Sequence, residues 1–282
     1  PKLRGNYRSV PMEELLVEAE QLSKEGTKEL IVIAQETTVY GVDLYGEKRL
    51  SKLLHELCKI DGIEWVRLLY CYPEEITEEL VQTIKTEKKI CHYLDLPIQH
   101  CNDDILKRMG RKTTQADLRE KISMLRKEIP DIALRTTLIS GFPGETNENH
   151  EECVDFVANM KFERLGVFPY SPEEGTPAAG YDRQVPEEIK QEWADEIMQT
   201  EQNVIFAQNE EMIGRRLSVI VDGYLPEDGV YVGRTYRDAP EIDGCLFFEA
   251  PYEIISGTIL PVLVTDANGY DLIGEILPEE DD

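Results

Sequence analysis

The chain has 282 residues, 41% hydrophobic and 30% charged, which is typical of a globular protein with one large or two modest domains. Its formal charge of −26 argues against a generic binder of nucleic-acid backbone and favours basic partners. No run of about 18 apolar residues predicts a membrane span, and no signal-peptide core opens the chain. We therefore expect a cytoplasmic protein. Because the chain does not begin with Met, we expect a fragment or a processed product.

The first three quarters of the chain alternate between apolar strands and amphipathic helices. The expected strands are 30–34, 65–70, 93–98, 134–139 and 165–168. The expected helices are 11–26, 50–57, 74–84, 103–109, 118–129, 147–160 and 186–207. Alternation of this kind predicts a parallel sheet with helical crossovers. A full eight-fold barrel needs about 250 residues, so residues 1–204 predict a partial TIM-like α/β barrel whose first strand lies upstream of Pro1.

The remaining residues, 205–282, change to short strands separated by glycine and aspartate turns. Strands are expected at 217–221, 230–232, 245–248, 259–264 and 272–276. This pattern predicts a small antiparallel, OB-like β-barrel. The segment holds 17 acidic and 4 basic residues, a net charge of −13. We expect it to bind a cationic partner rather than nucleic acid; the alternative is a solvated structural appendage.

Polar residues gather where the expected strands end. Alternation along a strand puts Asp95 and Gln99 on one face, and Arg135 and Thr137 on one face of the next strand in sequence. In parallel barrels, ligands bind at the carboxyl ends of the strands. We expect these four side chains to point into one lumen around a small polar ligand; a structural Asp–Arg pair is the alternative.

The segment Gly141-Phe-Pro-Gly-Glu145 joins an expected strand to an expected helix. A strand, a glycine turn and a helix N-terminus together present backbone N–H groups to a ligand. A plain βα corner is the alternative, because an isolated glycine motif has low specificity.

The cysteines and histidines show no metal-binding spacing. The six cysteines are Cys58, Cys71, Cys91, Cys101, Cys153 and Cys245, and the four histidines are His55, His92, His100 and His150. No CxxC, CxxxCxxC, HExxH or HxH pattern occurs among them, so we expect no metal ligands and buried, reduced thiols. His100 follows Gln99 and either faces the ligand or packs.

Several segments resemble the radical S-adenosylmethionine (SAM) methylthiotransferases. They are Ile33-Ala-Gln-Glu-Thr-Thr38, Asp95-Leu-Pro-Ile-Gln-His100, Leu134-Arg-Thr-Thr-Leu-Ile-Ser-Gly-Phe-Pro-Gly-Glu-Thr146 and Tyr170-Ser-Pro-Glu-Glu-Gly-Thr-Pro177. Gly233-Arg-Thr-Tyr-Arg-Asp-Ala-Pro-Glu-Ile-Asp-Gly244 resembles the TRAM domain of the RimO branch. That branch adds a methylthio group to the β-carbon of an aspartate in small-subunit ribosomal protein number twelve; the sister MiaB-like branch modifies an adenosine in tRNA.

The resemblance implies a radical SAM partial barrel followed by a TRAM domain, with SAM bound across the strand ends. It places Gln35 and Glu36 near the methionine moiety, and Asp95 and Gln99 near the ribose. The adenine side would hold Thr137 and the residues of the glycine turn, Gly141, Phe142, Pro143, Gly144 and Glu145. Arg135, which can hold a carboxylate, is a further expected cofactor-binding residue. The acidic residues expected to contact the basic substrate are Asp238, Glu241 and Asp243.

The chain departs from the family in two respects. The CxxxCxxC loop that holds the catalytic [4Fe–4S] cluster is absent, as is the N-terminal domain with a second cluster. We therefore expect that this chain ligates no cluster and is inactive alone. Two alternatives stay open: a MiaB-like tRNA enzyme, which the acidic C-terminal segment disfavours, and a module that only binds a ribosomal protein.

Overall fold

The computed structural model describes residues 5–277. The chain divides into two compact units, the first containing residues up to Pro97 together with Ser123–Ile132, and the second containing Ile98–Ile122 and the residues from Ala133 onward. Strand β3 (Ile90–Gln99) and helix α6 (Gln115–Glu128) each pass from one unit into the other. We describe each unit separately.

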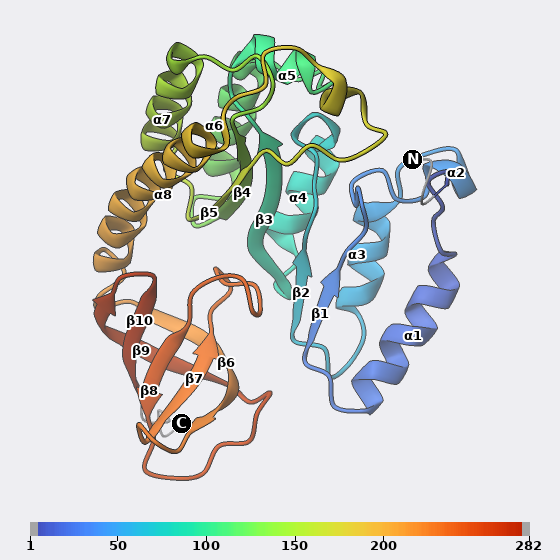
Figure 1. Ribbon diagram of the computed structural model, residues 1–282. Helices are drawn as coiled ribbons and strands as arrows, with labels where there is room; N and C mark the ends of the chain where they lie inside the picture. The colour runs from blue at the N-terminus through green and yellow to red at the C-terminus, as the bar shows by residue number, and fades with distance from the viewer. Residues whose placement is uncertain (1–4, 278–282) are drawn as a thin grey trace. The chain divides into compact units, whose positions relative to one another are not determined.

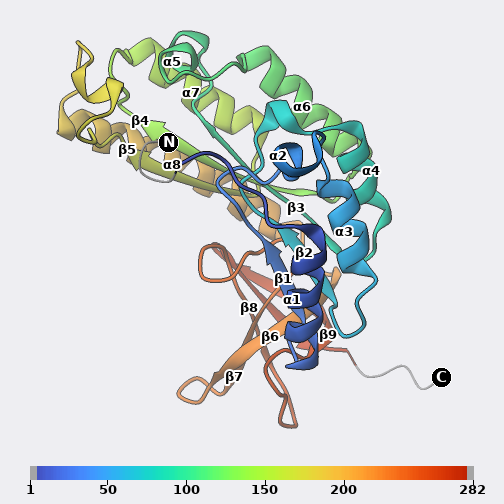
Figure 2. The same cartoon turned by 90° about the vertical axis from the view of Figure 1, so that its right-hand side faces the viewer.

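The first unit contains three parallel strands in the order β1, β2, β3 (Figure 1). β1 is Glu29–Val32 and β2 is Trp65–Leu68. Helices α1 (Met12–Lys24), α3 (Leu50–Cys58) and α4 (Glu78–Thr86) lie along the outer side of these strands (Figure 2). The core between these strands and helices is mainly aliphatic, because the strands and the helices both bury apolar faces there. Its fully buried side chains include Leu54, Ile63, Leu68, Ile84, Leu94 and Leu96.

Two local differences from the expected elements have clear causes. The expected helix 74–84 is a 3₁₀ turn, Pro73–Glu75, followed by α4. Thr77 separates them, because its side chain accepts a hydrogen bond from the Leu80 N–H and caps the helix. A short helix, α2 (Val42–Tyr45), fills an expected loop between Gly41 and Gly46, which both have positive φ.

The second unit begins with a parallel strand pair and its helices. β4 (Ala133–Ser140) pairs with β5 (Arg164–Pro169), and α7 (Asn147–Met160) forms the crossover between them. Helix α5 (Asp103–Arg108) follows β3, and a 3₁₀ turn, Pro177–Gly180, precedes α8 (Glu187–Glu210). The expected parallel βα architecture is thus confirmed.

The second unit ends in a closed five-stranded barrel (Figure 1). Its strands are β6 (Arg216–Leu225), β7 (Val230–Arg234), β8 (Leu246–Glu249), β9 (Ile259–Asn268) and β10 (Asp271–Ile276). The expectation of an entirely antiparallel barrel is wrong at one seam, since β8 and β10 run parallel where the barrel closes. The expected domain boundary after residue 204 falls inside α8, and residues 278–282 of the expected C-terminal domain lie outside the described residues.

Candidate functional site

In the first unit, two of the expected site residues hold the segment that follows β2. Asp95 accepts a hydrogen bond of 3.1 Å from the Tyr70 N–H through Oδ2, and its carbonyl accepts one of 2.9 Å from the Cys71 N–H. Glu36 Oε1 accepts hydrogen bonds from the Thr38 and Tyr72 N–H groups at 2.9 and 3.4 Å. Glu36 and Asp95 therefore hold the segment 70–72, where Tyr70 has a positive φ of 57°.

Glu36 retains one uncommitted carboxylate oxygen. Its Oε2 is buried and has no hydrogen-bond partner, whereas Oε1 also accepts a close hydrogen bond from the Thr38 hydroxyl. Burial raises the pKa of Glu36, although these hydrogen bonds oppose the shift. A buried, unpartnered carboxylate oxygen is suited to an ammonium or hydroxyl donor from a ligand.

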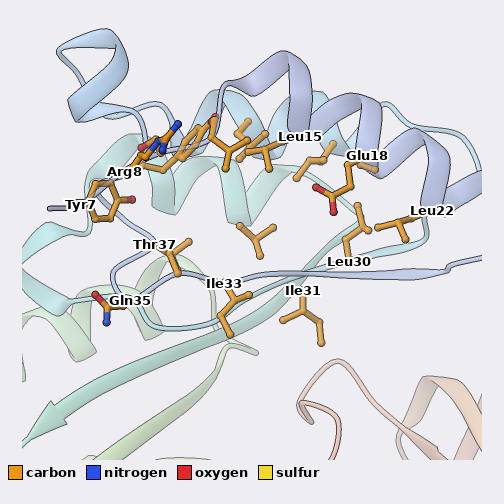
Figure 3. A pocket seen from close by; sticks show the side chains of 18 of the residues that line it. Tyr7, Arg8, Leu15, Glu18, Leu22, Leu30, Ile31, Ile33, Gln35 and Thr37 are labelled. Atoms are coloured by element: carbon orange, nitrogen blue, oxygen red, sulfur yellow. The ribbon is translucent and has the colours of Figure 1, made fainter. Parts of the chain in front are cut away.

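A cavity of about 580 Å³ lies along β1 and α1 in the same unit (Figure 3). Gln35 lines it and is exposed, together with Tyr7, Arg8 and Glu18. Most of the other lining side chains are apolar, among them Leu15, Leu22, Leu30 and Ile33. The expected residue Gln35 thus has access to open space, which Asp95, at 2% exposure, does not.

In the second unit, the glycine turn has the backbone that its sequence predicts. Gly141 and Gly144 have φ of 69° and 92°, values that residues with a side chain rarely adopt. Glu145 is buried and accepts a hydrogen bond of 2.9 Å from the Phe142 N–H through Oε2. Thr146 then caps α7 in a capping box with Asn149. The turn is therefore held by its own residues at the helix N-terminus.

Two basic side chains from distant elements support this turn. Lys190 of α8 is 4% exposed and donates to the Tyr170 carbonyl at 2.8 Å, and a Cβ added to Gly141 would lie 2.2 Å from its Cγ. Arg108 donates from Nε to the Pro143 carbonyl at 2.8 Å and lies 5.2 Å from the Tyr181 ring centre. Phe142 packs edge-to-face against Tyr170 and Tyr181. Sequence reasoning missed Lys190 and Arg108, because no local pattern links them to the turn.

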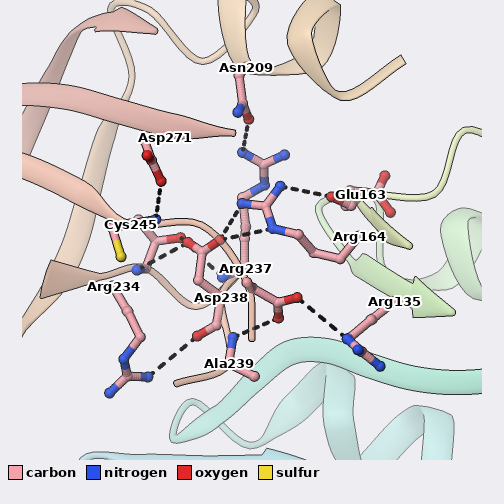
Figure 4. Close-up of polar contacts among 12 residues, drawn as sticks. Arg135, Glu163, Arg164, Asn209, Arg234, Arg237, Asp238, Ala239, Cys245 and Asp271 are labelled. Atoms are coloured by element: carbon pink, nitrogen blue, oxygen red, sulfur yellow. Dashed lines mark hydrogen bonds and ion pairs between the residues drawn. The ribbon is translucent and has the colours of Figure 1, made fainter. Parts of the chain in front are cut away.

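The remaining expected cofactor residues of this unit lie at the end of β3 and on β4. Gln99 ends β3 with a positive φ of 71°. Arg135 and Thr137 share one face of β4, with Nη1 and Oγ1 3.4 Å apart. Arg135 Nε also lies 3.4 Å from Asp243 Oδ1, so its charge is already partly compensated (Figure 4).

The three acidic residues expected to contact a basic substrate differ in exposure. Asp238 is buried and paired with Arg164 of β5 (Figure 4). Its burial would raise the pKa of the carboxyl, but the Arg164 and Arg237 guanidinium groups hold it below its usual range. The Asp243 side chain is 1% exposed and accepts a hydrogen bond from the Ala239 N–H. Of the three, only Glu241 lies on the surface. The sequence could not predict this difference, because a count of acidic residues does not separate solvated carboxylates from buried ion pairs.

Comparison with known families agrees with this architecture. The Radical SAM superfamily model matches residues 1–157, more than half of the chain. The chain belongs to the radical SAM superfamily. The TRAM domain model matches residues 213–277, which includes the whole closed barrel of this radical SAM protein.

Curated relatives of this radical SAM chain carry a common name, ribosomal protein uS12 methylthiotransferase RimO. The relative from Lachnoclostridium phytofermentans is 60% identical over 97% of this chain and 62% of its own length. That from Clostridium botulinum is 50% identical over 99% of this chain and 62% of its own length, and that from Clostridioides difficile is 49% identical over 99% and 63%. The chain therefore spans about three fifths of the length of the relatives it matches. Among residues 5–277, no helix has the length and apolar character that a membrane crossing requires.

Proposed function

We propose that this chain is the radical SAM barrel and TRAM portion of a RimO-type methylthiotransferase, which adds a methylthio group to the β-carbon of an aspartate in ribosomal protein uS12. The observation that carries this proposal is the 60% identity to the L. phytofermentans relative over 97% of the chain. A MiaB-like tRNA enzyme is not favoured by these relatives. The substrate implies work at the ribosome, and so a place in the cytoplasm.

SAM is the cofactor of the proposed enzyme, and each unit contains a separate set of proposed ligand residues. In the first unit, Gln35, Glu36 and Asp95 are the proposed ligands; the buried, unpartnered Glu36 Oε2 suits the ammonium group of the methionine moiety. In the second unit, Gly141 and Gly144 have positive φ, and the backbone of the turn Gly141–Glu145 is the proposed contact for an adenine edge. Gln99, Arg135 and Thr137 complete the proposed set. When bound beside an iron–sulfur cluster, SAM supplies a radical that abstracts hydrogen from an unactivated carbon.

The residues of this chain have supporting roles in that chemistry. Glu36 would orient the methionine end of SAM. Asp95 holds the segment 70–72, to which Glu36 is also hydrogen-bonded. Lys190 and Arg108 would hold the glycine turn in one conformation, which lowers the entropy lost when a ligand binds.

A [4Fe–4S] cluster does not fit the donors in this chain. Such clusters are held mainly by cysteine thiolates, and within residues 5–277 the one group of potential ligand atoms close together contains two cysteines and a histidine. We propose that this chain alone holds no cluster and is inactive. Reconstitution with iron and sulfide should leave no visible cluster absorbance, and a stoichiometric cluster would refute this part of the proposal.

The proposed partner is a basic ribosomal protein, and the TRAM region has the complementary charge. Residues 205–282 carry a net charge of −13, which favours a cationic partner and opposes RNA. Of the three acidic residues first considered, Glu241 is the one proposed to contact the substrate directly.

A chimaera tests the function. Residues 1–282 replace the matching segment of the L. phytofermentans relative, whose remaining part supplies whatever this chain lacks. Incubated with SAM, a reductant and a sulfur source, the chimaera should add one methylthio group to an aspartate of uS12, detected by peptide mass spectrometry. The intact relative is the positive control. Methylthiolation of a tRNA adenosine, with none of uS12, would overturn the proposal.

A further inference from the structure

Two buried polar atoms lie close together at the glycine turn of the second unit. His100 directly follows β3, and its Nε2 lies 3.3 Å from Oε1 of Glu145; the two side chains are 1% and 0% exposed. Within residues 5–277, neither atom has an aligned hydrogen-bond partner. Since a buried polar atom without a partner costs free energy, a small rotation that aligns the Nε2–H with this oxygen would be favourable.

The tautomer of His100 is set by its other ring nitrogen. Nδ1 accepts a hydrogen bond of 2.9 Å from the Asn102 N–H, so the proton of the neutral ring resides on Nε2. The Asn102 side chain in turn caps α5, because its Oδ1 accepts hydrogen bonds from the Asp104 and Ile105 N–H groups at 3.1 and 3.2 Å. His100 is therefore anchored to the start of α5 and directs an N–H toward Glu145.

Glu145 is anchored to the glycine turn. Its Oε2 accepts a hydrogen bond of 2.9 Å from the Phe142 N–H, and its own N–H donates one of 2.9 Å to the Phe142 carbonyl. Gly141 and Gly144, with φ of 69° and 92°, allow the backbone to fold back in this way. The conformation of the turn therefore depends on the position of the Glu145 carboxylate.

His100 connects this turn to the end of β3. Gln99 ends the strand with a φ of 71°, in the left-handed region that residues with a side chain rarely adopt. Such a conformation persists where surrounding contacts hold it. The ring of the next residue, His100, supplies contacts through both of its nitrogens. Its contact with Glu145 therefore links the backbone of Gln99 to the glycine turn.

We propose that His100 is a positioning residue for the adenosine part of SAM, and that its contact with Glu145 sets the spacing between Gln99 and the glycine turn. The inference rests on the proposed function, which makes Gln99 and the turn ligands of SAM. His100 is 1% exposed, so it acts through these two segments rather than by contact with SAM. Ligand groups that are held in position before binding lose less conformational entropy when the ligand arrives.

Two substitutions separate the two contacts of His100. In His100→Gln the side-chain amide can donate from near the position of Nε2, whereas in His100→Asn it can accept from the Asn102 N–H but does not reach Glu145. Binding of S-adenosylhomocysteine to the chimaera, measured by titration calorimetry, needs neither turnover nor uS12. His100→Asn should weaken this binding about tenfold, and His100→Gln should bring it back to within about threefold of wild type. Unchanged affinity in His100→Asn would overturn the proposal.

A double-mutant cycle tests whether His100 acts through Glu145. Glu145→Gln alters the acceptor of the contact and should itself weaken S-adenosylhomocysteine binding by about tenfold or more. Adding His100→Asn to Glu145→Gln should weaken binding no further, and losses that multiply would overturn the proposal. Circular dichroism checks the fold of each variant. Should His100→Asn not fold, Glu145→Gln tests the same contact from the side of the turn.

Hydrogen exchange of this chain without ligand gives a second readout. The Phe142 N–H is held by Glu145 Oε2, so its exchange, followed by NMR, should be about tenfold faster in His100→Asn than in wild type. The amides of β6, in the barrel of the same unit, should keep their exchange rates. Equal acceleration at Phe142 and in β6 would show a general loss of stability and would overturn the proposal.

His150 of α7 provides a matched control. It is 3% exposed, its Nε2 lies 2.8 Å from Oε2 of Glu196, and its ring stacks on Trp193, so both partners lie on α8. His150→Asn should lower the urea midpoint and leave the affinity for S-adenosylhomocysteine within about twofold of wild type. Equal weakening in His100→Asn and His150→Asn would give both histidines a merely structural role. A chimaera that binds S-adenosylhomocysteine without modifying uS12 would contradict the proposed function alone.

Discussion

Glu201 is a buried carboxyl group in α8 whose ionisation falls near neutral pH. Its side chain is 1% exposed, Oε2 accepts a hydrogen bond of 2.6 Å from the Tyr270 hydroxyl, and Oε1 is buried without a hydrogen-bond partner. Burial raises the pKa of Glu201 to about 7, against the opposing effects of Tyr270 and Arg164, while Asp243 adds to the rise. The protonated form is therefore favoured in the folded state.

Stability should consequently fall as the pH rises through the window between the two pKa values. The carboxyl has a pKa of about 4.3 when unfolded, so between that value and about 7 the folded state binds the extra proton. Glu201→Gln removes this pH dependence. The free energy of unfolding of the variant minus that of wild type should therefore be larger at pH 8 than at pH 5, by about 1–3 kcal/mol. Urea denaturation at both pH values measures this difference. Glu192→Gln, an exposed position on the same helix, should show no such change; an equal difference at both pH values for Glu201→Gln would contradict the assignment.

The Arg164–Asp238 pair joins β5 to the TRAM region by a buried contact. The two side chains are 5% and 3% exposed. Removing one member leaves the other charge buried, and Asp238→Ala should cost about 3–5 kcal/mol. Lys24→Ala breaks an exposed pair with Glu20, 71% and 58% exposed, and should cost less than about 1 kcal/mol. Thermal unfolding of both variants measures the two losses of stability. Similar losses would mean that Arg164 and Asp238 do not form a tight buried pair.

At the scale of elements, the β4–turn–α7 unit depends on glycine at position 141. Alanine there must adopt a φ of 69°, and its Cβ would lie 2.2 Å from Lys190 Cγ. We expect Gly141→Ala to destabilise the chain by about 2 kcal/mol or more, from left-handed backbone strain plus the displaced lysine. Gly180→Ala is the control, because its Cβ meets nothing within 4 Å and its φ is not positive. Equal midpoints in urea for the two variants would contradict both the backbone strain at position 141 and the contact with Lys190.

The β4–turn–α7 segment also shows which features could be predicted from the sequence and which could not. The strand, the glycine turn and the helix start at Asn147 were predictable, because each depends on neighbouring residues. Lys190 and Arg108 were not, since they reach the turn from α8 and α5. Composition also misled for Asp238 and Asp243, which the structure uses internally. Tertiary pairing, rather than local propensity, accounts for these differences.

At the scale of the whole molecule, half of the net negative charge lies in the TRAM region, because basic residues are few there. Residues 205–282 contain 17 of the 56 acidic residues and 4 of the 30 basic residues. Arg234 and Arg237 are buried, and Arg234 is paired with Asp222. The two buried arginines are matched by the buried carboxylates of Asp238 and Asp243, so the region keeps its net charge of −13, which should attract a basic protein over distances of about the Debye length, 8–10 Å.

This charge predicts salt-dependent binding to the proposed substrate, uS12. Neutralising three exposed TRAM acids, with Glu227→Gln, Asp228→Asn and Glu241→Gln together, should weaken binding about tenfold at low salt and less at 0.5 M salt, by titration calorimetry. The matched control neutralises three exposed acids of α8, with Glu188→Gln, Glu192→Gln and Asp195→Asn, and should change affinity less than about twofold. Both triples lower the net negative charge equally, so a general effect of charge would weaken binding in both. An effect confined to the TRAM triple would locate uS12 recognition there, whereas equal effects would leave only non-specific attraction.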